Sequence, residues 1–121
     1  MGHRILIVED EHLVRELLAE ALSHAGYETA VARNGDRAIA MMNATHPFDL
    51  LLTDISMPGT ADGNAVAARA KQVFPGLPVL YVSGRPDSVT NKMGRRDVFV
   101  SKPFGMGELV AAVGRLMSPK Q

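Results

Sequence analysis

The sequence predicts an α/β domain in which helices cover both faces of a doubly wound, five-stranded parallel sheet. Five short apolar runs alternate with longer segments of helical period, and this alternation is typical of repeated β-α units. The chain has 121 residues, of which 46% are hydrophobic, so it can bury one compact core but not two. We therefore expect residues 1–121 to form a single domain, with 118–121 as a short tail or the start of a linker.

The expected strands are short and rich in β-branched residues or leucine. The first, Arg4–Val8, is apolar at every inner position, which is expected of a central strand that helices cover on both faces. The other expected strands span residues 27–32, 49–53, 77–82 and 98–100.

The expected helices follow each strand in turn. The first has apolar residues at three- and four-residue spacing from Leu13 to Ala25, and it ends at Gly26, which suits the left-handed position after a helix. The others begin at Asn34-Gly35 and end before Pro47, span residues 64–74, and carry an apolar stripe from Met106 to Met117.

Residues 84–97 give the weakest helical pattern. Pro86, Gly94 and a run of polar residues leave few apolar side chains that a helix could bury. We expect a short or frayed fourth helix there, whose amides exchange with solvent faster than those of the first and last helices.

Composition excludes several classes of protein. Acidic and basic residues cancel at 13 each, so net charge does not direct the chain toward nucleic acid or an anionic membrane. There is no cysteine, and hence no disulfide framework and no thiolate metal site. The longest apolar runs are too short to span a bilayer, and the first residues lack the pattern of a signal peptide. We expect a cytoplasmic location.

Polar residues follow four of the five expected strands directly. In an open parallel sheet, ligands bind beyond the carboxyl ends of the strands, where these residues would gather. Each alone has a plain structural explanation, since an acid at a strand end often solvates a loop or caps a helix. Together they predict a site that contains Glu9-Asp10-Glu11, Asp54, Ser83 and Lys102-Pro103.

The chemistry of this set favours phosphoryl transfer. Clustered carboxylates repel one another unless a hard cation binds them, and magnesium fits because it accepts a few carboxylate oxygens and leaves room for phosphate. Asp10 and Asp54 could hold the metal. The ammonium of Lys102 and the hydroxyl of Ser83 could then surround the oxygens of a phosphoryl group on Asp54.

Four segments of the chain resemble the motifs of the response regulator receiver domain of bacterial two-component systems. The segments are Leu6-Ile7-Val8-Glu9-Asp10, Leu52-Thr53-Asp54-Ile55-Ser56-Met57-Pro58, Val82-Ser83-Gly84 and Ser101-Lys102-Pro103-Phe104. They occur in the right order, each at the end of its own strand, and the resemblance covers essentially the whole chain. It implies a flavodoxin-like sheet with strand order 2-1-3-4-5.

The resemblance also implies a role for each residue of the acidic site. Asp54 would accept the phosphoryl group from a phosphohistidine. Glu9 and Asp10 would form the acidic pocket that binds magnesium, Glu9 through a water molecule, and the backbone carbonyl of Ser56 would complete the metal site. Lys102 would contact the phosphoryl oxygens.

Two further residues would form the family's switch. Ser83 would move toward the phosphoryl group, and Phe99 would turn inward into the space that Ser83 leaves. The peptide bond between Lys102 and Pro103 would be cis. The alternative for Phe99 is an ordinary core aromatic.

The implied partners are a sensor histidine kinase or a histidine phosphotransfer protein, together with an unidentified downstream protein. The domain would catalyse only its own phosphorylation and dephosphorylation. We expect a monomer or weak dimer without direct contact to nucleic acid or membrane. Ser56 and Arg85 occupy the positions that tune hydrolysis in this family, and Arg85 could shield the acyl phosphate or face water.

The sequence departs from the family pattern in two places. The 58–63 loop is one residue longer than usual, and residues 83–102 are fewer than expected. The basic residues Arg85, Lys92, Arg95 and Arg96 could form a docking patch or a solvated loop.

Three other functions remain as alternatives. A magnesium-dependent aspartyl phosphohydrolase would need a second carboxylate two residues after Asp54, where the chain has Ser56. A flavin-binding domain would place its phosphate against the acidic strand exits. A binding module independent of phosphorylation would not need this set of residues.

Overall fold

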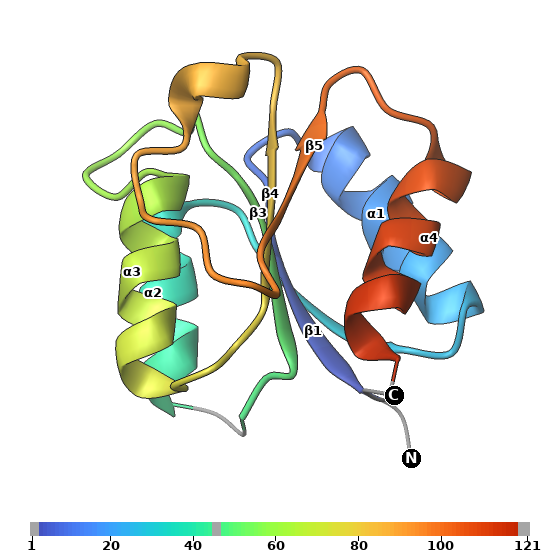
Figure 1. Cartoon of the computed structure of the whole chain (residues 1–121), viewed down its shortest axis with the longest axis horizontal. Helices are drawn as coiled ribbons and strands as arrows, with labels where there is room; N and C mark the ends of the chain where they lie inside the picture. The colour runs from blue at the N-terminus through green and yellow to red at the C-terminus, as the bar shows by residue number, and fades with distance from the viewer. Residues whose placement is uncertain (1–2, 45–46, 119–121) are drawn as a thin grey trace.

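Five parallel strands form the centre of the protein in the computed structural model, which describes residues 3–44 and 47–118. The sheet order is β2-β1-β3-β4-β5, and every neighbouring pair of strands is parallel (Figure 1). The predicted fold class and strand order are therefore confirmed. The strands are β1 Arg4–Val8, β2 Glu28–Ala32, β3 Leu50–Asp54, β4 Val79–Ser83 and β5 Val98–Ser101.

Helices cover both faces of the sheet. Figure 1 shows α1 and α4 on one side and α2 and α3 on the other. The helices are α1 His12–His24, α2 Gly35–Ala44, α3 Gly63–Val73 and α4 Met106–Met117. The chain leaves α1 through Gly26, whose φ of 102° lies in the left-handed region as predicted. In the part of the chain that the structure describes, no helix has the length and apolar character needed to cross a bilayer.

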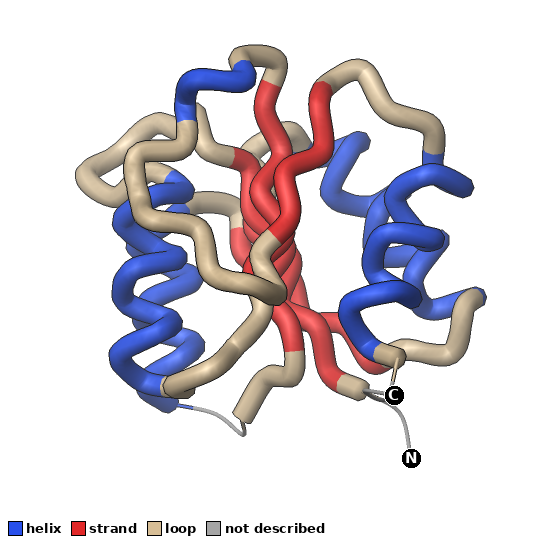
Figure 2. Tube along the Cα trace, in the orientation of Figure 1, coloured by secondary structure: helices blue, strands red, loops and turns tan. Residues whose placement is uncertain are grey.

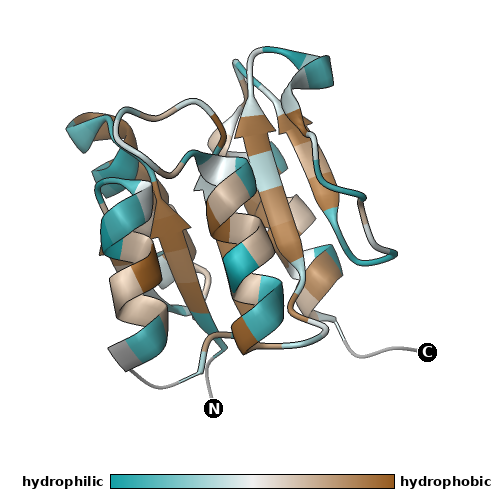
Figure 3. Ribbon diagram, turned by 90° about the vertical axis from the view of Figure 1, so that its left-hand side faces the viewer, coloured by the Kyte–Doolittle hydropathy of each residue, from teal (hydrophilic) through white to brown (hydrophobic). Residues whose placement is uncertain are grey.

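Alternation along the strands divides the core into two layers. Ile5 and Ile7 pack in the cluster beneath α1 and α4, whereas Leu6 and Val8 pack in the cluster beneath α2 and α3. Side chains of a strand point alternately to the two faces, so a strand that is apolar at every position serves both layers. Figure 3 shows the resulting pattern, with strands that are hydrophobic along their length and helices that carry hydrophilic residues.

The short or frayed fourth helix expected between β4 and β5 does not form as an α-helix. Residues 84–97 contain a single 3₁₀ turn, Pro86–Ser88, and otherwise form an irregular loop that crosses in front of the sheet (Figure 2). The physical reason is visible in the sequence, since a helix here would have almost no apolar face to bury. The loop thus replaces the helix of the fourth strand-helix unit, and β5 is again followed by a helix, α4.

Two polar side chains hold the 84–97 loop in place. The Asn64 side chain donates to the carbonyl of Ser88 at 3.0 Å and accepts from the amide of Thr90 at 3.0 Å. At the other end, the buried Asp97 carboxylate accepts from the amide of Gly94 at 2.6 Å and from Lys71 Nζ at 2.9 Å. Hydrogen bonds from neighbouring elements therefore replace the apolar packing of a helix.

These contacts predict which amides of the 84–97 loop exchange slowly with solvent. We expect rapid exchange across 87–95 relative to α1 and α4, with slower exchange at Thr90 and Gly94, whose N–H groups are bonded to side chains. Hydrogen exchange followed by NMR would measure this residue by residue. Uniform strong protection across 87–95 would contradict the loop.

Candidate functional site

The register of the sheet brings the carboxyl ends of the strands to one edge. Val8 at the end of β1 is paired with Thr53, Asp54 at the end of β3 with Val82, and Ser83 at the end of β4 with Ser101. The residues that follow these positions therefore meet beyond the carboxyl ends of the central strands. This is the edge at which the sequence predicted a site.

Three carboxylates gather at this edge. Glu9, Asp10 and Asp54 each offer an oxygen atom, and these oxygens all lie within 4.8 Å of one another. Glu9 and Asp54 are 2% and 5% exposed, whereas Asp10 faces solvent. The oxygen donors of this cluster match the ligands that magnesium prefers, and one open side leaves space for water and phosphate.

Lys102 is the cation closest to the buried carboxylates. Its Nζ lies 3.0 Å from Asp54 Oδ2 and 3.9 Å from Glu9 Oε1. The backbone amide of Lys102 donates to the carbonyl of Ser83 at 2.9 Å, which joins the ends of β4 and β5. The Lys102–Pro103 peptide bond is cis.

The other predicted site residues, Ser83, Phe99 and Ser56, differ in burial. Ser83 is buried, and its Oγ accepts from the amide of Arg85 at 3.1 Å. Phe99 is half-buried and packs against the core cluster beneath α2 and α3. Ser56 is exposed and lines a cleft of about 640 Å³ beside Asp54, together with Arg85 and Asp87.

Burial and neighbouring charges shift the pKa values of Glu9, Asp54 and Lys102. Burial raises the pKa of Glu9 to about 7, against the hydrogen bond from the Glu11 amide and with the added repulsion of Asp54. Burial also raises the pKa of Asp54, although the hydrogen bond from Lys102 opposes this rise. The pKa of Lys102 is raised because its bond to Asp54 and the nearby acidic charges outweigh its burial, which acts to lower it. A bound cation would favour the ionised carboxylates.

We expect the metal-free protein to lose stability as pH rises from about 5 to 8. The pKa of Glu9 is about 7 in the folded state, against 4.5 for the unperturbed carboxyl group. Between these values the folded state keeps a proton that the unfolded chain has released, so folding becomes less favourable as pH rises, by about 3 kcal/mol in all. Urea unfolding in EDTA at several pH values would measure the slope.

Glu9→Gln is the matched control for this pH dependence. It keeps a polar side chain of the same size but cannot ionise, so the free energy of unfolding of the variant should depend less on pH. A wild-type stability that is flat or rises over this range would contradict the expected ionisation of Glu9.

Gly63 and Thr53 support the site and were missed in the sequence. A Cβ atom on Gly63 would collide with the backbone carbonyl of Asp54, so α3 can begin this close to the acidic cluster only with glycine. The Gly63 amide donates to the carbonyl of Ile55 at 2.8 Å, and Thr53 Oγ1 donates to the carbonyl of Asp54 at 2.8 Å. The glycine at the start of the helical pattern was the available signal.

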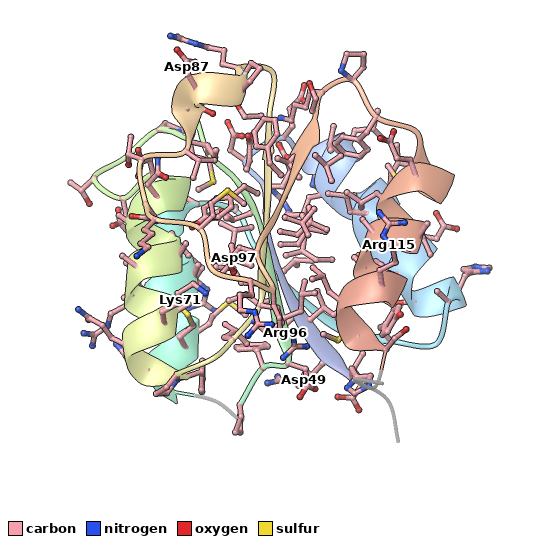
Figure 4. All side chains as sticks on the ribbon, in the orientation of Figure 1. Asp49, Lys71, Asp87, Arg96, Asp97 and Arg115 are labelled. Carbon is pink, nitrogen blue, oxygen red and sulfur yellow. The ribbon has the colours of Figure 1, made fainter. Side chains whose placement is uncertain are left out.

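The basic residues of the 84–97 loop do not form one patch. Arg85 lies near the acidic edge, with its Nε 3.9 Å from Asp87 Oδ1, and both side chains are exposed. Arg95 and Arg96 line a second cleft together with the end of α4. Figure 4 places Asp87 at one end of the molecule and Arg96 toward the other.

Comparison with known proteins identifies the family. The model of the response regulator receiver domain matches residues 5–114. The response regulator receiver protein CpdR of Brucella abortus is 35% identical over 120 residues, which cover 94% of this chain and 96% of CpdR. The response regulator MprA of Mycobacterium tuberculosis is 35% identical over 97% of this chain, but the match covers 51% of MprA. The chain thus spans about half the length of the first curated relatives that it matches.

A solved structure agrees with the sequence comparison. The response regulator protein TrrA from Thermotoga maritima, solved in complex with Mg(2+)-BeF, is 31% identical and aligns with a TM-score of 0.82 over 95% of this chain and 99% of that one. With the confirmed strand order and an acidic cluster that fits the Mg²⁺ site of receiver domains, the matches show that the chain belongs to the response regulator receiver domains of two-component systems.

Proposed function

We propose that the protein accepts a phosphoryl group from a phosphohistidine onto Asp54 and changes conformation to control a partner protein. Receiver domains of response regulators are signalling modules that interact with histidine kinases or phosphotransfer proteins. The observation that carries the proposal for this chain is the position of Asp54 Oδ2, 3.0 Å from Lys102 Nζ and within an acidic cluster. Residues 1–121 would form one domain, which would be located in the cytoplasm.

Asp54 would act as the nucleophile. One of its carboxylate oxygens attacks phosphorus, the new P–O bond forms as the P–N bond to the donor imidazole breaks, and the electron pair leaves with the imidazole. The ammonium of Lys102 would stabilise the charge on the equatorial phosphoryl oxygens. The Thr53 hydroxyl bonds the Asp54 carbonyl and so holds the end of β3 during this step.

Glu9, Asp10, Asp54 and the backbone carbonyl of Ser56 would hold magnesium. The chemical fit rests on the oxygen donors of the cluster and on the crowding of two buried carboxylates, Glu9 and Asp54. When bound, the ion supplies positive charge that neutralises the transferring phosphoryl oxygens. Glu9, which is more deeply buried than Asp10, would contact the ion through a water molecule.

Ser83 and Phe99 would carry the conformational change. Ser83 Oγ accepts a hydrogen bond from the Arg85 amide, which it would give up on turning to donate its own hydroxyl hydrogen to a phosphoryl oxygen on Asp54. Phe99 is paired with Tyr81 in the sheet and is only partly buried, so it can turn further into the core cluster beneath α2 and α3. The 84–97 loop follows Ser83 directly and would move with it.

The test is the intact mass of the protein after incubation with acetyl phosphate, with and without magnesium. We expect an added mass of one phosphoryl group that requires magnesium and that hydroxylamine removes, because an acyl phosphate is open to attack at the carbonyl carbon. Tandem mass spectrometry of borohydride-reduced protein would locate the adduct. A cognate kinase or phosphotransfer protein would serve as the second donor.

The outcomes separate the alternatives. Absence of an adduct with every donor would contradict the proposal and favour a module that binds partners without phosphorylation. Steady release of phosphate from an added phosphomonoester, without a stable adduct, would favour the phosphohydrolase.

A further inference from the structure

A second cleft lies at the opposite edge of the sheet from the acidic cluster. It has a volume of about 890 Å³ and is bounded by the end of α3, by residues 94–96 and by the end of α4. Because helices of a β-α unit run antiparallel to its strands, the ends of α3 and α4 lie at the amino-terminal edge of the sheet. We call this feature the basic cleft. Its charged lining consists of Lys71, Arg95, Arg96 and Arg115.

The basic cleft concentrates positive charge in a chain of zero net charge. Lys71 is paired with the buried Asp97 at 2.9 Å. Within residues 3–44 and 47–118, no carboxylate lies within 4.0 Å of Arg95, Arg96 or Arg115. The acidic cluster and these three arginines therefore lie at opposite edges of the sheet.

Helix ends account for part of this charge but not all of it. Lys71 and Arg115 lie in the last turns of α3 and α4, where a cation interacts favourably with the carbonyl end of a helix. Each helix end is equivalent to about half of a negative charge. Two such ends and Asp97 leave an excess of positive charge in the cleft, and Arg95 has no helix end to stabilise.

Two of the four cations are positioned in advance. Arg96 donates from one terminal nitrogen to the carbonyl of Leu116 at 2.7 Å, which leaves other guanidinium N–H groups available. Lys71 is held by Asp97 and by the carbonyl of Leu77 at 3.0 Å. Figure 4 shows Lys71 and Asp97 toward each other in front of the sheet, with Arg96 below them and Arg115 on α4. A cation that is already fixed loses little entropy when it binds an anion.

The shape and lining of the basic cleft point to a small molecule. Its volume lies within the range of small-molecule sites, which is about 300–1,000 Å³. Leu77, Leu116 and Met117 supply apolar surface between the cations. Guanidinium groups bind phosphate through two parallel hydrogen bonds, and the apolar surface suits a flat ring system.

We propose that the basic cleft binds a phosphate-bearing small molecule of nucleotide size, with its phosphates on Arg95, Arg96 and Arg115. The site is separate from Asp54 and goes beyond the proposed receiver function. A ligand in the cleft contacts α3, α4 and the segment that precedes β5. It therefore stiffens the irregular 84–97 loop at the end that Asp97 holds.

The test is isothermal titration calorimetry of the whole chain with ATP, pyrophosphate and adenosine in EDTA. Removing magnesium prevents metal-bridged binding of phosphate at the acidic cluster. We expect ATP to bind, pyrophosphate to bind more weakly and adenosine not to bind. Arg95→Ala/Arg115→Ala should weaken ATP binding by about tenfold or more, because two charge-assisted contacts are lost.

Arg33→Ala/Arg37→Ala is the matched control, since these arginines line a different cleft beside β2. This variant should bind ATP as the wild type does. In NMR spectra, ATP should shift the amides of Gly76 and Gly94, which line the basic cleft, and leave those of Glu9 and Asp10 unchanged.

Three results would overturn the proposal. The first is no binding of any phosphate probe at millimolar concentration. The second is an equal loss of affinity in both double variants, which would mean non-specific attraction. The third is binding of an acidic peptide but not of ATP, which would assign the cleft to a protein partner.

Discussion

Asp54→Asn should abolish the phosphoryl adduct. The amide has the shape of the carboxylate and can still accept a hydrogen bond from Lys102, but it is a far weaker nucleophile toward phosphorus. We expect labelling by acetyl phosphate to fall below detection in intact-mass spectra. The variant should fold at least as stably as the wild type, because burial raises the pKa of Asp54 and so disfavours its charge.

Asp87→Asn is the matched control for this loss. Asp87 lines the cleft beside Asp54, but its side chain is 82% exposed and lies away from the acidic cluster. Labelling of this variant should equal that of the wild type. An adduct that persists in Asp54→Asn would move the acceptor to another carboxylate, with Asp10 as the first candidate.

Asp97→Ala should cost about 3–5 kcal/mol of stability, a large share of the roughly 5–15 kcal/mol typical of a folded domain. The Asp97 carboxylate is fully buried and accepts from the amides of Val79 and Gly94 and from Lys71 Nζ. Its removal leaves the buried amide of Val79, the amide of Gly94 and the partly buried ammonium of Lys71 without their acceptor. Urea unfolding followed by circular dichroism would give the change in free energy.

Two further variants separate this anchor from a general charge effect. Asp97→Asn keeps one acceptor oxygen and should lose less stability than Asp97→Ala. Asp87→Ala removes an exposed carboxylate from the same loop and should change the free energy of unfolding by less than about 0.5 kcal/mol. A loss below about 1 kcal/mol in Asp97→Ala would show that other contacts hold the loop.

The strands could be predicted from the sequence because burial on both faces leaves a simple pattern, whereas their order followed from the family resemblance. An apolar run such as Ile5 to Val8 is typical of a central strand in a parallel sheet. The grouping of the polar residues that follow the strands was equally predictable, since the carboxyl ends of parallel strands must share one edge. Glu9, Asp10, Asp54 and Lys102 therefore came together as the spacing and the family resemblance implied.

The 84–97 loop could not be derived in the same way. Its fold depends on Asn64 and Asp97, most of whose partners lie 18 to 27 positions away in the chain, and no local pattern reports such contacts. The scarcity of apolar residues correctly indicated that a helix would be unstable there, but it could not show which structure would form instead. The basic cleft was hidden for the same reason, since Lys71, Arg96 and Arg115 come from three separate elements.

Gly63 makes the position of the acceptor depend on a residue without a side chain. Because a Cβ atom at this position would overlap the backbone carbonyl of Asp54, any larger residue must push the start of α3 and the end of β3 apart. In a mutagenesis screen for signalling, substitutions at Gly63 should resemble lesions of the acidic cluster, although Gly63 supplies no chemical group. Ranking residues by their reactive atoms would place this position last, whereas ranking them by mutational tolerance would place it beside Asp54.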